Sequence, residues 1–182
     1  FGQWHTRVAQ RRAIFRILHR GDFAARLRGL NMRDTFKIET VAIDINEALQ
    51  AVSHEAHGAA DIFVGTVRNH NLGRAVSGMS YDVFDALALN TFADIAKQAR
   101  TQWGDDLAIY ISHFKGDLPI GGVSIVIAVS SKHRDESFQA CRFLIEAIKL
   151  NAPVWKQEHY VDGDREWVLG HTLRQHWLIW LN

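Results

Sequence analysis

Residues 107–131 have the sequence LAIYISHFKGDLPIGGVSIVIAVSS, and this stretch decides the fold class. Two β-branched, apolar runs (107–116 and 122–131) flank DLPIG, whose Pro119 and Gly121 are typical of a turn. The pattern predicts two strands joined by a short connection, and strands joined in this way pair antiparallel. The centre of the chain therefore favours an antiparallel sheet over the parallel sheet of a doubly wound fold.

Helices are predicted on both sides of this strand pair. Residues 85–103 and 135–150 each carry apolar residues at helical spacing, and Asn151 and Pro153 end the second helix. Their apolar positions are Leu87, Ala88, Phe92, Ile95, Ala96 and Ala99 in the first, and Phe138, Cys141, Leu144, Ile145 and Ile148 in the second. A shorter helix is expected to follow Asn46 as its N-cap and to run to about Ala56.

The remaining apolar runs predict further strands. These runs are 35–45, 59–68, 75–84, 153–161 and the short segment 166–169. The second and third are separated by NHNLGR, whose asparagine and glycine content predicts a hairpin with a long loop. Together the elements predict an α+β domain with a mostly antiparallel sheet and about three helices.

Composition sets limits on the class of protein. A chain of 182 residues with 47% hydrophobic content is long enough for one domain with a continuous core. Its single cysteine excludes an intramolecular disulfide framework, and no cluster of cysteine and histidine has the spacing of a zinc site. No apolar run reaches the roughly 18 residues of a membrane span. These features predict a cytoplasmic protein without a metal.

The N-terminal segment differs from the rest in charge. Residues 1–31 hold seven arginines and one acid, Asp22, whereas residues 32–182 hold 14 basic and 19 acidic residues. We expect residues 1–31 to be a disordered basic extension, or translated sequence upstream of Met32, and residues 32–182 to be the folded domain. A targeting or docking helix and an RNA-binding tail remain alternatives.

Three groups of polar residues interrupt apolar elements, and each has an ordinary explanation as well. Arg68 ends a predicted strand, where it could simply be solvated. His133 and Arg134 open the last helix, whose first turn favours anions. Lys149 lies in the last turn of that helix, where the helix dipole favours a cation without any function. Taken alone, each of these residues could be either an ordinary surface residue or a ligand-binding residue.

Lys156 lies on the strand after that helix. Alternation along the strand places Val154, Lys156 and Glu158 on one face and the residues between them on the other.

Cys141 lies on the apolar stripe of the predicted helix 135–150, without a histidine–aspartate pair nearby in sequence. This position favours a packed core thiol over a nucleophile.

Taken together, these segments resemble the MoaE family, the large, catalytic subunits of molybdopterin synthase. The matching segments are GAADIFVGTVRNHNLGRAV (58–76), YDVF (81–84), SSKHRDESFQAC (130–141), IKLNAPVWKQE (148–158) and DGDREWV (162–168). They are long and ordered, and the resemblance covers about residues 36–169. It implies a fold like the α/β-hammerhead.

The resemblance implies a sulfurtransferase of molybdenum cofactor biosynthesis. Enzymes of this family convert cyclic pyranopterin monophosphate to molybdopterin with sulfur from the C-terminal glycine thiocarboxylate of a small ubiquitin-like carrier subunit. The family also implies a homodimer within a heterotetramer. It implies no cofactor, no nucleic acid and no membrane, because molybdenum enters only the later product.

The same resemblance assigns site residues. It implies catalytic roles for Lys149 and Lys156. It implies substrate-binding roles for Arg68, His133 and Arg134, for the strand residues Phe63, Thr66 and Val67, and for Gln157 and Glu158. Near the C-terminus, the family's basic residue could correspond to His171 or Arg174. The chain departs from the family pattern at Asp82 and Gly122, where glutamate is usual, and neither position is a proposed catalytic group.

Helix geometry adds an inference about assembly. Fifteen helical steps lead from Arg134 to Lys149, or roughly 22 Å along a helix axis. One small substrate cannot contact both ends. We therefore expect a composite site in which His133 and Arg134 of one subunit face Lys149 and Lys156 of a twofold partner.

One alternative belongs to another functional class. A non-catalytic module could use both lysines only for their charge, to hold a ubiquitin-like tail or a phosphate ligand. An arginine would then replace either lysine without loss, whereas an enzyme that needs a free amine would not tolerate it.

Overall fold

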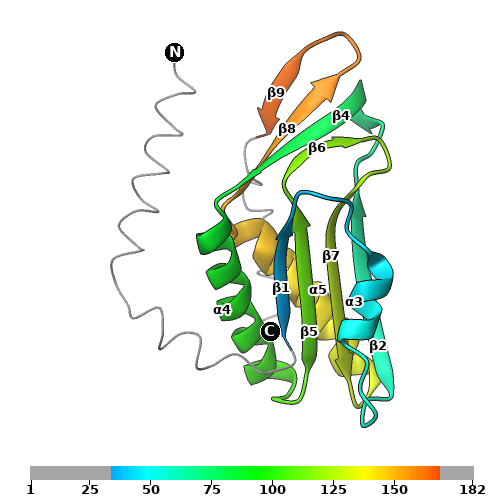
Figure 1. Ribbon diagram of the computed structural model, residues 1–182, viewed down its shortest axis with the longest axis vertical. Helices are drawn as coiled ribbons and strands as arrows, with labels where there is room; N and C mark the ends of the chain where they lie inside the picture. The colour runs from blue at the N-terminus through cyan, green and yellow to red at the C-terminus, as the bar shows by residue number, and fades with distance from the viewer. Residues whose placement is uncertain (1–33, 169–182) are drawn as a thin grey trace, which may run out of the picture. The chain divides into compact units, whose positions relative to one another are not determined.

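The computed structural model describes residues 34–168 (Figure 1). The predicted extension 1–31 and the tail residues His171 and Arg174 lie outside the described residues. In the described part, the helices are α3 (Ile45–Ala51), α4 (Asp85–Trp103) and α5 (Arg134–Asn151). This part contains no helix long and apolar enough to cross a membrane.

The first sheet has the strand order β1-β5-β7-β2. Its strands are β1 (Thr35–Glu39), β5 (Ala108–Phe114), β7 (Val123–Ser131) and β2 (Ala59–Thr66). β5 and β7 pair antiparallel, as the sequence predicts, and β2 pairs antiparallel with β7. The edge strand β1 pairs parallel with β5. The sheet is thus mostly antiparallel.

The second sheet is built around β4 and β8. It contains β3 (His70–Asn71), β4 (Arg74–Val83), β8 (Val154–Tyr160) and β9 (Arg165–Val168) in that order, with β6 (Gly116–Pro119) paired to β4. All of these pairings are antiparallel. The mostly antiparallel α+β fold with three helices is therefore confirmed in the described part.

Helices cover both faces of the first sheet. α4 and α5 pack on one face, where Phe92 and Leu144 meet Ile109 in the larger core cluster. α3 packs on the other face, where Ala48 meets Tyr110 in a second cluster. Adjacent residues of β5 thus point into different cores, as strand alternation requires.

The predicted hairpin between residues 59–68 and 75–84 is wrong. β2 pairs with β7 in the first sheet, whereas β4 pairs with β6 and β8 in the second. β2 has apolar residues on both faces, which suits a sheet covered by helices on both sides. β4 has Ser80 and Asp82 on one face, which suits a sheet with a more solvated side. The actual short hairpin joins β3 and β4.

Several local predictions also need correction. β1 ends at Glu39 instead of continuing to residue 45, and most of the predicted turn 117–121 forms β6. Phe138 is 55% exposed and does not belong to the buried stripe of α5.

The predicted packed environment of Cys141 agrees with the structure. Cys141 is 2% exposed, and burial raises the pKa of its thiol to about 12, which fits a packed thiol rather than a nucleophile.

The N-cap of α3 is Asp44 and not Asn46, because the Asp44 side chain accepts a hydrogen bond from the Asn46 backbone N–H at 2.8 Å. We expect Asp44→Ala to lower the free energy of unfolding by about 1 kcal/mol. Asn46→Ala keeps this N–H and is the matched control, with an expected change of a few tenths of a kcal/mol. Urea unfolding of both variants measures the difference, and equal losses would contradict this cap assignment.

Candidate active site

A small pocket of about 80 Å³ lies where the end of β2 approaches β4 and β8. Its lining includes Thr66, Arg68, Asn71, Tyr81, Lys156 and Glu158. Four of these are predicted site residues, two near the end of β2 and two on β8. The fold therefore brings Arg68 and Lys156 to one place although they lie far apart in the sequence.

Glu158 forms the buried polar centre of this pocket and is 1% exposed. Its Oε2 accepts hydrogen bonds from Asn71 Nδ2 and from the Tyr160 hydroxyl, both at 2.7 Å. Its Oε1 lies 3.6 Å from Lys156 Nζ. A carboxylate with these partners is satisfied within the chain, and two of the partners, Asn71 and Lys156, line the pocket with it.

Arg68 is exposed at the entrance to the pocket. Its Nη2 donates a hydrogen bond of 3.4 Å to Asn71 Oδ1. Asn71 thus connects Arg68 to Glu158 and limits where the guanidinium can lie. Arg68 and Lys156 supply two cationic groups beside one cavity, an arrangement that suits an anionic ligand.

Lys149 lies in the last turn of α5 and is exposed. Its Nζ is 5.9 Å from the centroid of the Phe63 ring on β2, within the range of a cation–π contact. Phe63 is half-buried and packs against the larger core cluster. The ammonium group therefore lies over an apolar ring at the surface, where an incoming chain segment could reach it.

His133 and Arg134 lie at the opposite end of α5, where His133 is the N-cap residue and Arg134 the first helical residue. Both are exposed, and neither lines the pocket. The observed helix bounds agree with the predicted separation of roughly 22 Å from Lys149. Within one subunit, these two residues are therefore not brought to the lysines.

Val67 and Gln157 occupy different surroundings from the pocket residues. Val67 is 2% exposed, and its backbone N–H and C=O both bond within the chain, to Gly122 O at 3.0 Å and Gly121 N at 2.9 Å. Gln157 lies between Lys156 and Glu158, so strand alternation turns it toward the other face of β8. Substrate contacts for both residues stay predictions.

Three residues that line the pocket or bond to its lining were not predicted from the sequence. Asn71 lies in NHNLGR, which composition marks only as a loop. Tyr160 follows Glu158 by two positions, so the alternation that groups Val154, Lys156 and Glu158 would have included it. Tyr81 also lines the pocket, and burial raises the pKa of its hydroxyl, which remains a neutral hydrogen-bonding group at neutral pH.

Sequence comparison finds relatives over most of the chain. The family described as MoaE protein matches residues 38–151. The molybdopterin synthase catalytic subunit of Synechococcus elongatus is 38% identical over 143 residues, which cover 79% of this chain and 87% of the relative. The molybdopterin synthase catalytic subunit 1 of Aedes aegypti is 40% identical over 127 residues, or 69% of this chain and 82% of the relative.

Solved structures share the fold. The molybdopterin synthase from Staphylococcus aureus matches with a TM-score of 0.69 at 30% identity and covers 78% of this chain and 100% of its own. A complex of subunits 1 and 2 of the molybdopterin-converting factor from Helicobacter pylori matches with a TM-score of 0.62 at 29% identity. That match covers 79% of this chain and 98% of the other.

Proposed function

The chain belongs to the MoaE protein family, and from this membership we propose that it works as the catalytic subunit of a molybdopterin synthase. It is an enzyme of molybdenum cofactor biosynthesis that acts with a small partner subunit. The observation that carries the proposal is the pocket in which Arg68 and Lys156 come together.

The proposed reaction places two sulfurs on cyclic pyranopterin monophosphate. In each transfer, the C–S bond of the carrier's terminal thiocarboxylate and a C–O bond at the accepting substrate carbon both break, and the sulfur bonds to that carbon. The displaced substrate oxygen either passes to the carrier and completes its carboxylate, or stays with its own substituent while a water oxygen completes the carboxylate. Both the phosphate and the thiocarboxylate are anionic, so both favour a site with arginine and lysine.

Lys149 is proposed to contact or attack the terminal carbonyl of the carrier, with Lys156 assisting. The exposed position of Lys149 over Phe63 supports this role, since a docked C-terminal tail of the carrier could reach the amine without any rearrangement of the core. A tail over this surface would also remove water from the amine and strengthen its polar contacts.

The substrate site is proposed to be composite. The pocket of about 80 Å³ is small beside the roughly 300–1,000 Å³ of ordinary small-molecule sites. His133 and Arg134 lie at the far end of α5, so a twofold partner would have to supply them. We therefore propose a homodimer at the centre of a heterotetramer, with His133 and Arg134 of the partner subunit facing the lysines.

Mixed dimers test this arrangement. Arg134→Ala and Lys149→Ala should each be inactive as homodimers, because every site lacks one group. In a mixed dimer one site loses both groups and the other keeps both, so random exchange should restore about a quarter of wild-type activity. The measurement is product formation before and after subunit exchange. If exchange restores no activity, the site lies within one subunit.

A further inference from the structure

The two oxygens of the Glu158 carboxylate have separate partners. Oε2 accepts from both Asn71 and Tyr160, each at 2.7 Å, while Oε1 faces Lys156 Nζ at 3.6 Å. Two donors on one oxygen fix the plane and the rotation of the carboxylate. The orientation of the group that faces Lys156 is therefore set by residues outside the predicted site.

Tyr160 is itself held by a contact over the face of its ring. The guanidinium carbon of Arg74 lies 3.6 Å from the centroid of the Tyr160 ring, a close stacking distance. Tyr160 is 6% exposed, and its backbone N–H bonds to Asp164 O at 2.9 Å. Its hydrogen bond to Glu158 raises the pKa of the hydroxyl, so the hydroxyl keeps its proton and remains a donor at neutral pH.

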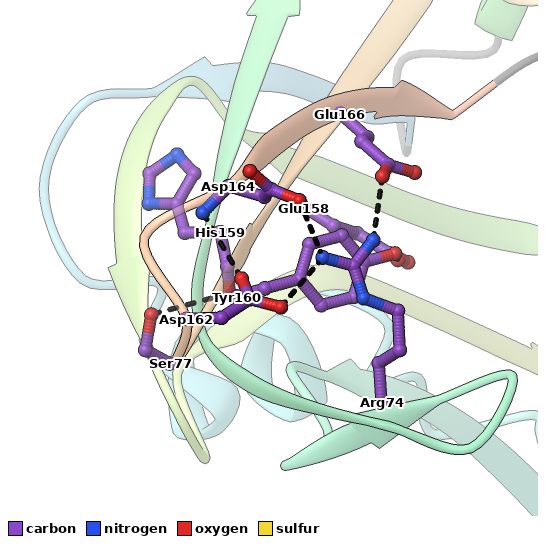
Figure 2. Close-up of polar contacts among 8 residues, drawn as sticks. All are labelled: Arg74, Ser77, Glu158, His159, Tyr160, Asp162, Asp164 and Glu166. Carbon is purple, nitrogen blue, oxygen red and sulfur yellow. Dashed lines mark hydrogen bonds and ion pairs between the residues drawn. The ribbon is translucent and has the colours of Figure 1, made fainter.

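Arg74 is held in turn by three carboxylates of the turn and strand after β8 (Figure 2). Its Nη2 donates to Asp162 Oδ2 and Asp164 Oδ2, both at 2.8 Å, and its Nη1 donates to Glu166 Oε1 at 2.5 Å. These bonds, first of all the one to Asp162, raise the pKa of Arg74 above its ordinary value. The start of β4 is thereby tied to the β8–β9 hairpin against the tyrosine ring.

We propose that Tyr160 is a positioning residue for Lys156: its hydroxyl, with the Asn71 amide, orients Glu158 so that this carboxylate holds the lysine ammonium at the pocket. The stack between Arg74 and the ring keeps the hydroxyl in place. Tyr160 acts through Glu158 and has no role in binding the substrate. The assignment of a catalytic purpose to this contact rests on the proposed function.

Replacement of Tyr160 by phenylalanine tests the proposal, because it removes the hydroxyl and keeps the ring against Arg74. We expect a roughly tenfold lower rate at saturating substrate, the size of effect for a lost hydrogen bond to a charged group. The half-saturating substrate concentration should change less than the rate, because Lys156 keeps its place on the strand beside the pocket. Tyr110→Phe is the matched control, since Tyr110 is fully buried on β5 away from the pocket, and it should keep the wild-type rate.

A double-mutant cycle separates positioning from a general structural effect. If Tyr160 acts only through Glu158, Tyr160→Phe should add no further loss in a Glu158→Gln background. If the two substitutions lower the rate by factors that multiply, the proposal is overturned. It is also overturned if Tyr160→Phe keeps the wild-type rate, or if this substitution raises only the half-saturating substrate concentration.

A second readout does not depend on turnover. Acetic anhydride labels free amines, and peptide mass spectrometry compares Lys156 with Lys149 in the same sample. In Tyr160→Phe, labelling of Lys156 should rise relative to Lys149 as the lysine leaves its partner, while Tyr110→Phe should match the wild type. Unchanged relative labelling would overturn the positioning role. An inactive wild type with the expected labelling would instead count against the proposed function alone.

Discussion

Lys149→Arg should reduce the single-turnover rate of sulfur transfer by at least about a hundredfold, a typical contribution of a group that reacts or transfers a proton. Arginine keeps the positive charge and the reach over Phe63. Its guanidinium, however, stays protonated and offers no free amine. The measurement is the rate of dithiolene formation with thiocarboxylated carrier in excess over enzyme.

The matched control for this result is Lys97→Arg. Lys97 is an exposed lysine in the middle of α4 and does not line the pocket, so its replacement should leave the rate unchanged. Carrier binding by Lys149→Arg should also persist, since the charge is kept. A Lys149→Arg enzyme with normal turnover would contradict the proposed role of the amine. A non-catalytic binding module would also tolerate the arginine.

The free energy of unfolding should decrease by about 3 kcal/mol as the pH falls from 7 to 4 because of His113 alone. His113 is 6% exposed on β5, and its Nδ1 hydrogen-bonds to Phe114 O at 2.8 Å. Burial lowers the pKa of this imidazole from 6.5 to about 4, and the bond to Phe114 offsets part of that effect. The folded protein therefore holds His113 neutral.

The direction of this pH effect follows from the lowered pKa. An unfolded chain binds a proton at His113 below pH 6.5, whereas the folded protein does so only near pH 4. The contribution of His113 is thus complete above pH 6.5 and is lost as the pH falls from there to about 4. Urea unfolding at several pH values, compared between wild type and His113→Gln, isolates it from the carboxylates. Identical pH slopes would contradict this account.

Local sequence patterns predicted the two long helices and the central strands well, whereas α3 ends at Ala51 and not near Ala56. The bounds predicted for α4 are the observed ones, because its apolar residues at helical spacing are followed by a glycine stop at Gly104. The pairing of β5 with β7 followed from a short connection between two strands. Such features depend on neighbours in the sequence, so they can be recognised without the rest of the fold.

The partners of β2 and β4 could not be recognised in that way. β2 pairs with β7 and β4 pairs with β8, and both partner strands come from distant parts of the chain. The same limit applies to Glu158, which resemblance assigned to substrate binding. Its bond to Asn71 requires the pairing of β3 with β4 and of β4 with β8, which composition does not contain.

The most direct test of sulfur transfer is a single-turnover reaction of cyclic pyranopterin monophosphate with this chain and a thiocarboxylated small subunit. We expect dithiolene product to form and two carrier thiocarboxylates to be consumed for each molecule of product. No product should form when the carrier ends in an ordinary carboxylate. Tight carrier binding without any product would rule out the proposed enzyme and would identify the chain as a binding module.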